Sequence, residues 1–125
     1  LGAGLQYVEQ EGIEATRARE VALAERLAQG LSEIRAVRMH GPSGWGSRLA
    51  VLMTTVHEML PEDVGAILDG DYDIAVRTGL HCAPLAHEGL KTFPIGGVRF
   101  SIGPFNTTEH IDRAIFAMAE IARNR

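Results

Sequence analysis

The order in which helix-like and strand-like segments follow one another is the feature that most constrains this chain. Residues 13–34 and residues 111–122 repeat apolar side chains at the i, i+3, i+4, i+7 spacing of a helix that packs on one face. Short apolar runs rich in β-branched residues indicate four strands, at Val37–His40, Leu49–Val56, Ile74–Arg77 and Gly97–Ile102. Taken in order, the segments predict an α/β domain: a mixed four-stranded sheet with helices mainly on one face.

Glycine, proline and capping residues divide these segments. Gly12 ends a weakly helical start and precedes the long helix. Pro61 is expected to open a third helix, because proline is favoured at the first helical position, and Gly70 is expected to follow its end. Asn106 or Thr107 is expected to cap the last helix. With 125 residues and no linker or repeat, the chain is predicted to form a single domain over residues 1–125.

Charge and cysteine content exclude several function classes. The formal net charge of -4 argues against a general attraction to nucleic acid, and no apolar run approaches the length of a membrane span. Cys82 is the only cysteine, so an internal disulfide is impossible, which fits a reducing cytoplasm. The five histidines lack the i, i+4 spacing of a helical zinc site, so no metal site is expected.

Cys82 closes the hexapeptide Arg77–Cys82, directly after an apolar run. It is predicted to lie near a strand-to-helix junction, and Arg77 and His81 can add positive charge that favours a reactive thiolate. A lone cysteine is also commonly a small buried apolar residue. Both readings, nucleophile and core residue, remain open on these grounds.

Arg99 is the second candidate. Alternation along a strand places Val98 and Phe100 on one face and Arg99 on the other. A planar, permanently charged guanidinium suits the carboxylate of a substrate. The alternative is a strand arginine that is merely solvated.

Three blocks in order resemble a known family. The stretches Ile74–Pro84, Val98–Ser101 and Gly103–Thr107 resemble the C-terminal domain of cysteine desulfurases, within the class V aminotransferase group of pyridoxal-phosphate enzymes. The nearest branch is type II, which includes selenocysteine lyases. Its loop reads Arg-x-Gly-x-His-Cys-Ala, followed by Arg-x-Ser and then Asn-Thr. The resemblance implies the small C-terminal domain of a fold-type I pyridoxal-phosphate enzyme.

The resemblance also implies residue roles. Cys82 matches the cysteine that takes sulfur from L-cysteine as a persulfide while L-alanine leaves, and Arg99 matches the arginine that binds the substrate carboxylate. Arg77, Thr78 and His81 match the frame of the catalytic loop. The family implies a homodimeric full-length enzyme, a sulfur-acceptor protein as partner, and a supply of sulfur for iron–sulfur cluster assembly.

The cofactor is expected to be held outside this chain. Pyridoxal 5'-phosphate needs a lysine for its Schiff base, and in the family that lysine follows a histidine. The single lysine here, Lys91, follows Leu90 and does not match. No cofactor-binding residue is therefore expected, the isolated chain is expected to be inactive, and residues 1–12 are expected to end a helix linking to a large cofactor-binding domain.

Departures from the family leave the substrate open. Many type II enzymes carry His-His before the cysteine, whereas this chain has Leu80-His81. A selenocysteine lyase or another class V aminotransferase-like enzyme is one alternative, and a stand-alone sulfur-carrier or interaction domain is another.

An exposed apolar surface is expected near Leu5, Tyr7 and Val8.

Overall fold

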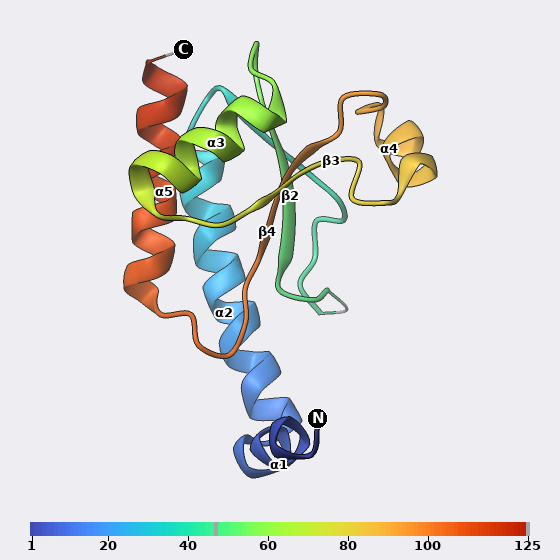
Figure 1. Cartoon of the computed structure of the whole chain (residues 1–125), viewed down its shortest axis with the longest axis vertical. Coiled ribbons are helices and arrows are strands. Elements are labelled where there is room, and N and C mark those ends of the chain that lie inside the picture. The colour runs from blue at the N-terminus through green and yellow to red at the C-terminus, as the bar shows by residue number, and fades with distance from the viewer. Residues whose placement is uncertain (47, 125) are drawn as a thin grey trace.

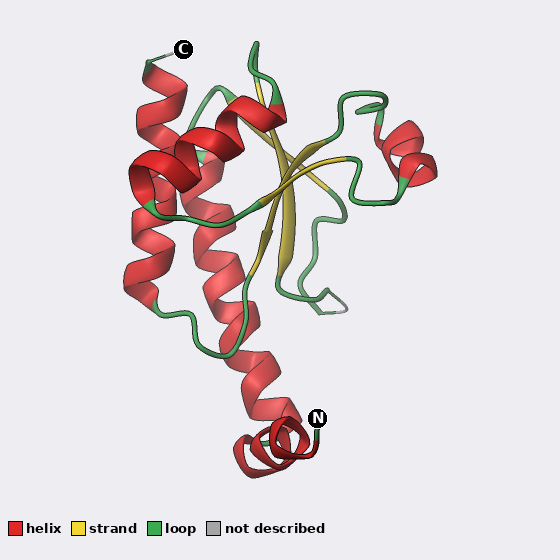
Figure 2. Cartoon of the chain, viewed as in Figure 1, coloured by secondary structure: helices red, strands yellow, loops and turns green. Residues whose placement is uncertain are grey.

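The computed structural model describes residues 1–46 and 48–124 and places three helices against one face of a four-stranded sheet (Figures 1 and 2). The elements are α1 (Gly2–Glu11), α2 (Ile13–Ser32), β1 (Val37–His40), β2 (Val51–Val56), α3 (Pro61–Tyr72), β3 (Arg77–Gly79), α4 (Pro84–Leu90), β4 (Gly97–Ser101) and α5 (Thr108–Arg123). Helices α2, α3 and α5 form the covering layer, and α4 lies on the far side of the sheet from α5 in Figure 1. The expected α/β class is confirmed.

Pairing within the sheet is antiparallel throughout, where the sequence predicted mixed pairing. The strand order is β1-β2-β4-β3, and all three neighbouring pairs are antiparallel. The helix α3 does connect two parallel strands, β2 and β3, as a crossover helix should. The later strand β4 lies between them, however, so these two parallel strands never pair directly.

The core forms where α2, α3 and α5 meet the sheet. Leu27 of α2, Leu68 of α3, Leu52 of β2 and Met118 of α5 are each at most 1% exposed. Burying side chains of this size stabilises a fold by about 1.5–3 kcal/mol each. The helical stripes predicted from the sequence therefore face this core.

The end of α3 and the start of β3 differ most from the sequence prediction. Helix α3 continues through Gly70 to Tyr72 and ends at Asp73, which adopts a left-handed conformation with φ 55°. The chain then turns back at once, because the N–H of Ile74 donates to the carbonyl of Leu68 at 2.9 Å. Residues 74–76 are consequently held beside α3, and strand β3 begins only at Arg77.

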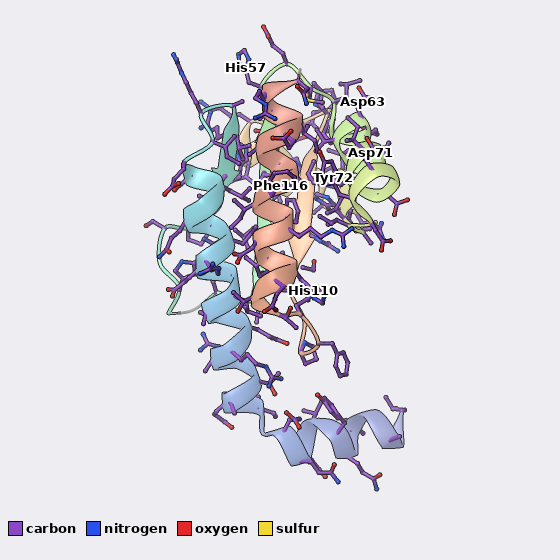
Figure 3. The ribbon with its side chains drawn as sticks, turned by 90° about the vertical axis from the view of Figure 1, so that its left-hand side faces the viewer. His57, Asp63, Asp71, Tyr72, His110 and Phe116 are labelled. Carbon is purple, nitrogen blue, oxygen red and sulfur yellow. The ribbon has the colours of Figure 1, made fainter. Side chains whose placement is uncertain are left out.

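Two side-chain contacts lie at the end of α3 and at the start of α5. Tyr72 of α3 meets Phe116 of α5 edge to face at 6.4 Å between ring centroids (Figure 3). Thr107 caps α5, because its hydroxyl accepts from the N–H of His110 while the His110 ring accepts from the Thr107 N–H. Of the two expected capping residues, Thr107 is the one used.

Helix α1 projects away from the body of the domain (Figure 3). It meets α2 at Gly12, whose φ of 78° is left-handed. All ten residues of α1 are described and none of them is buried. Leu5 and Val8 are exposed as expected, whereas Tyr7 is half-buried and packs its ring against Phe105 at 5.4 Å between centroids. Within the described residues, no helix is both long and apolar enough to cross a membrane.

Candidate active site

The face of the sheet opposite the helices carries a pair of arginines. Val98 and Phe100 of β4 are buried against the helices, so alternation turns Arg99 to the other face, as predicted. Arg99 is in register with Arg77 of β3 on one side and with Met53 of β2 on the other. The two arginine side chains therefore leave neighbouring strands on the same face.

Arg99 has an unmet hydrogen-bonding capacity. Among the described residues, its buried Nε has no hydrogen-bond partner. A guanidinium has only donors, and a buried donor without an acceptor costs free energy, so such groups call for an explanation. A bound carboxylate would supply the missing acceptor in the fork geometry that arginine favours.

Cys82 lies in a tight turn between β3 and α4. His81 and Cys82 both adopt left-handed backbone conformations, with φ of 52° and 58°. Two consecutive non-glycine residues in this region cost about 1 kcal/mol or more each. The turn is closed by the N–H of Ala83, which donates to the carbonyl of Leu80 at 2.8 Å. Cys82 is exposed on this turn, which disfavours the reading of a buried apolar cysteine.

His81 points back from the turn toward β3. Its Nε2 lies 3.2 Å from the carbonyl oxygen of Arg77, and its ring centroid lies 5.4 Å from that of His87. Burial lowers the pKa of His81 from its ordinary value, the hydrogen bond to the Arg77 carbonyl opposes this, and electrostatic interaction with Arg99, His87 and Arg77 lowers it further. The neutral form of the His81 ring is therefore favoured relative to that of a free histidine.

The lowered pKa of His81 gives a testable pH dependence. The folded chain releases the His81 proton more readily than the unfolded chain does, so as pH falls below about 6.5 the unfolded state binds more protons. The contribution of His81 to the free energy of unfolding is thus present above pH 6.5 and is lost as pH falls toward the folded pKa. We expect NMR titration of the His81 ring to show a midpoint below that of a model histidine peptide. A midpoint above it would contradict this assignment.

Two glycines allow the strands on either side of the cysteine turn to approach closely. Gly79 ends β3 with φ 85°, and Gly96 precedes β4 with φ 87°. A Cβ atom on Gly96 would overlap the backbone of Gly79, so only glycine fits there. The loop that carries Cys82 is therefore closed at its base by a contact between backbones.

Replacing Gly96 by alanine is expected to lower the free energy of unfolding by about 2–4 kcal/mol, because it combines backbone strain with overlap. Urea denaturation would measure this. Gly89→Ala in α4 is the matched control, since its new Cβ meets nothing within 4 Å and alanine is favoured over glycine in helices by about 0.5–1 kcal/mol. Equal effects of the two substitutions would contradict the packing described here.

The other predicted residues lie in different surroundings. Thr78 alternates to the helix side of β3 and packs against Gly65 of α3, on the face opposite Arg77. Lys91 is exposed at the end of α4. A Schiff-base lysine works in a desolvated site, so the lysine of this chain does not fit covalent attachment of pyridoxal phosphate. Within the described ranges, no three His, Cys, Asp or Glu side chains gather closely enough to hold a metal ion.

Sequence reasoning did not single out His87 or Thr92. His87 is only 3% exposed, and its Nδ1 lies 2.7 Å from the Thr92 hydroxyl oxygen. One histidine among five carries no pattern of its own, and the contact depends on how the chain turns after α4. The nearest available signal was its position, five residues beyond Cys82.

The family model for class V aminotransferases, described as "Aminotransferase class-V", matches residues 1–114. The chain belongs to the class V aminotransferase family. Among curated relatives of this class V aminotransferase chain, a "Probable cysteine desulfurase" of Pyrococcus abyssi is 31% identical over 99% of the chain and 30% of that protein. "Probable cysteine desulfurase 2" of Mycobacterium leprae is 33% identical over 92% of the chain and 27% of that protein. The chain thus spans about 30% of the length of these relatives.

Solved structures agree with the class V aminotransferase assignment. The apo cysteine desulfurase of Thermococcus onnurineus NA1 superposes with a TM-score of 0.92 and 32% identity, over 98% of this chain and 30% of that one. A cysteine desulfurase of Escherichia coli gives a TM-score of 0.79 at 23% identity, over 98% of this chain and 29% of that one, and supports the fold alone.

Proposed function

We propose that this chain is the cysteine-loop part of a pyridoxal-phosphate-dependent cysteine desulfurase, in which Cys82 receives sulfur from L-cysteine and L-alanine is released. One observation carries the proposal. An exposed cysteine on a strained turn follows a strand whose Arg77 pairs with Arg99, and Arg99 has a buried Nε that lacks an acceptor among the described residues. The names of the relatives agree with this chemistry.

Each residue then has a distinct task. Arg99 binds the α-carboxylate of the amino acid and so fixes its orientation. The Cys82 thiolate attacks the sulfur of the substrate: a new S–S bond forms and the bond between that sulfur and Cβ breaks. The electron pair of the broken bond stays on the carbon, which takes a proton and becomes the methyl group of alanine. Cys82 keeps the transferred sulfur as a persulfide.

The cofactor would be held by the rest of the parent enzyme. Pyridoxal phosphate, when bound, supplies the electron sink that makes this cleavage possible. Lys91 does not fit its covalent attachment, so the present residues contribute the nucleophile and the carboxylate anchor. In this proposal α1 belongs to a helix that connects to the cofactor-holding part, which agrees with its exposed Leu5 and Val8.

The proposal extends to the surroundings of the enzyme. The exposed turn would present the persulfide to a sulfur-acceptor protein, as in a cytoplasmic, homodimeric enzyme that feeds iron–sulfur cluster assembly. A persulfide must leave the substrate pocket to be passed on, and an outlying turn suits that movement.

The decisive experiment weighs the peptide that carries Cys82. The parent enzyme, loaded with pyridoxal phosphate, is given L-cysteine, alkylated and digested with trypsin. Cleavage after Arg77 and Lys91 yields one peptide, residues 78–91, that contains the only cysteine of this chain. We expect one added sulfur that a reductant removes, together with released alanine.

Other outcomes point to the alternatives. Alanine release with an unmodified peptide would place the nucleophile elsewhere. No alanine from cysteine, but alanine from selenocysteine, would favour a selenocysteine lyase. A peptide that gains sulfur only from a separate persulfide donor would favour a sulfur carrier.

A further inference from the structure

His87 is a buried histidine to which the proposed chemistry assigns no task. It lies on α4 with 3% of its surface exposed. Its ring contacts that of His81 at 5.4 Å between centroids, at an angle of 41°. His87 thus reaches from α4 to the residue beside Cys82. A buried imidazole in contact with a second imidazole is a costly arrangement unless its polar atoms are satisfied.

Thr92 fixes the orientation of the His87 ring. The Thr92 hydroxyl donates to the carbonyl oxygen of His87 at 3.4 Å, and its oxygen lies 2.7 Å from His87 Nδ1. The 2.7 Å contact makes the Thr92 hydroxyl and His87 Nδ1 hydrogen-bond partners, and the tautomer of His87 decides which of the two donates. The backbone N–H groups of Thr92 and Phe93 donate to the same carbonyl at 2.9 and 3.2 Å, so this segment is held firmly against His87.

The tautomer of His81 follows from its hydrogen-bond partner. Its Nε2 faces the carbonyl oxygen of Arg77, which can only accept, so Nε2 carries the proton of the neutral ring. Nδ1 is therefore the unprotonated nitrogen. The groups that act electrostatically on His81 are Arg77 of β3, Arg99 of β4 and His87 of α4. All three oppose protonation, so the neutral ring, with Nδ1 free to accept a proton, is the favoured form before the thiol proton is transferred.

We propose that His87, held by Thr92, is a positioning residue: its ring orients the His81 imidazole so that His81 Nδ1 takes the thiol proton of Cys82. The S–H bond breaks, an N–H bond forms at Nδ1, and the sulfur keeps the electron pair as the thiolate. His81 retains its Nε2 proton and its bond to the Arg77 carbonyl throughout. The inference rests on the proposed function, since it assigns the proton acceptor for the same nucleophile.

The test uses two variants and two readouts. In His87→Asn the amide keeps a hydrogen-bonding group for Thr92, but the ring that contacts His81 is lost. Thr92→Val removes the hydroxyl at nearly constant volume. NMR of the nitrogen-15-labelled chain should show one His81 tautomer, with the proton on Nε2, in the wild type and a mixture in both variants. In the parent enzyme we expect both variants to lower kcat about 10-fold and to leave KM within about 2-fold of wild type. This loss is a fraction of the rate that a well-positioned proton acceptor contributes.

Matched variants separate positioning from stability. Thr92→Ser keeps the hydroxyl and is expected to restore both the tautomer and kcat. His110→Asn places the same substitution at the start of α5, outside the site, and is expected to leave His81 unchanged. If His87→Asn and Thr92→Val lower thermal stability while His81 keeps its tautomer and kcat is unchanged, the role is structural and the inference is wrong.

The two proposals fail in different ways. A wild-type enzyme that forms no persulfide on Cys82 overturns the proposed function, and with it the proton transfer assigned here. A wild-type enzyme that forms the persulfide, with both variants behaving like it, overturns this inference alone.

Discussion

Replacement of Cys82 by serine is expected to reduce alanine release from L-cysteine on the order of 10³-fold or more. The hydroxyl of serine keeps the size of the side chain and the turn, but it cannot form the S–S bond that holds the transferred sulfur. The measurement is the rate of alanine formation by the parent enzyme with saturating pyridoxal phosphate. Cys82 is exposed, so the substitution is expected to leave the free energy of unfolding within about 0.5 kcal/mol.

Ala86→Ser is the matched control for this prediction. Ala86 is exposed on the neighbouring helix α4, so the change adds the same hydroxyl nearby without touching the thiol, and activity should persist. A Cys82→Ser enzyme that still released alanine at the normal rate would refute the assigned nucleophile and favour transaminase-like chemistry. Loss with cysteine but normal turnover of selenocysteine would favour the lyase alternative.

Replacement of Arg99 by glutamine is expected to lower kcat/KM about 10²–10⁴-fold, mostly by raising KM. Two hydrogen bonds from a charged donor to a carboxylate contribute about 1.5–3 kcal/mol each, and about 1.4 kcal/mol corresponds to a factor of ten. Steady-state kinetics over a range of L-cysteine concentrations would measure the split between kcat and KM.

The stability of the Arg99 variant distinguishes a binding role from a structural one. The buried Nε lacks an acceptor among the described residues, so removing the charge should leave the free energy of unfolding unchanged or higher. Arg38→Gln is the control. Arg38 pairs with Thr55 of β2 and therefore lies on the same face of the sheet as Arg99. This variant should keep KM near the wild-type value. An unchanged KM in Arg99→Gln would refute carboxylate binding.

Local patterns in the sequence predicted most of the elements and the capping of α5, because these depend on neighbouring residues. The alternation around Arg99 placed Val98 and Phe100 in the core correctly. Strand pairing depends on which segments meet after the chain has folded. No local signal indicated that β4 would insert between the parallel strands β2 and β3, so the predicted mixed pairing was wrong.

The candidate site likewise contains residues that local sequence predicts and residues that only the folded chain brings together. The motif around Cys82 and the strand alternation at Arg99 are readable from residues close in sequence. The contact of His87 with His81 follows a turn in which His81 and Cys82 are both left-handed, and its contact with Thr92 follows the left-handed Lys91 that ends α4. Non-glycine residues in that conformation are uncommon, so sequence reasoning had no ground to expect them.

The pairing of Gly79 with Gly97 has a consequence for how this part of the family can diversify. Because these two residues are partners in the sheet, the residues between them form one loop that begins and ends at the same paired position. Residues can be inserted into or deleted from this loop without shifting the register of any strand. The entropic cost of closing a longer loop grows only slowly with its length. Arg99, the proposed carboxylate anchor, stays in its place on β4 while the length of the segment that carries Cys82 is free to vary.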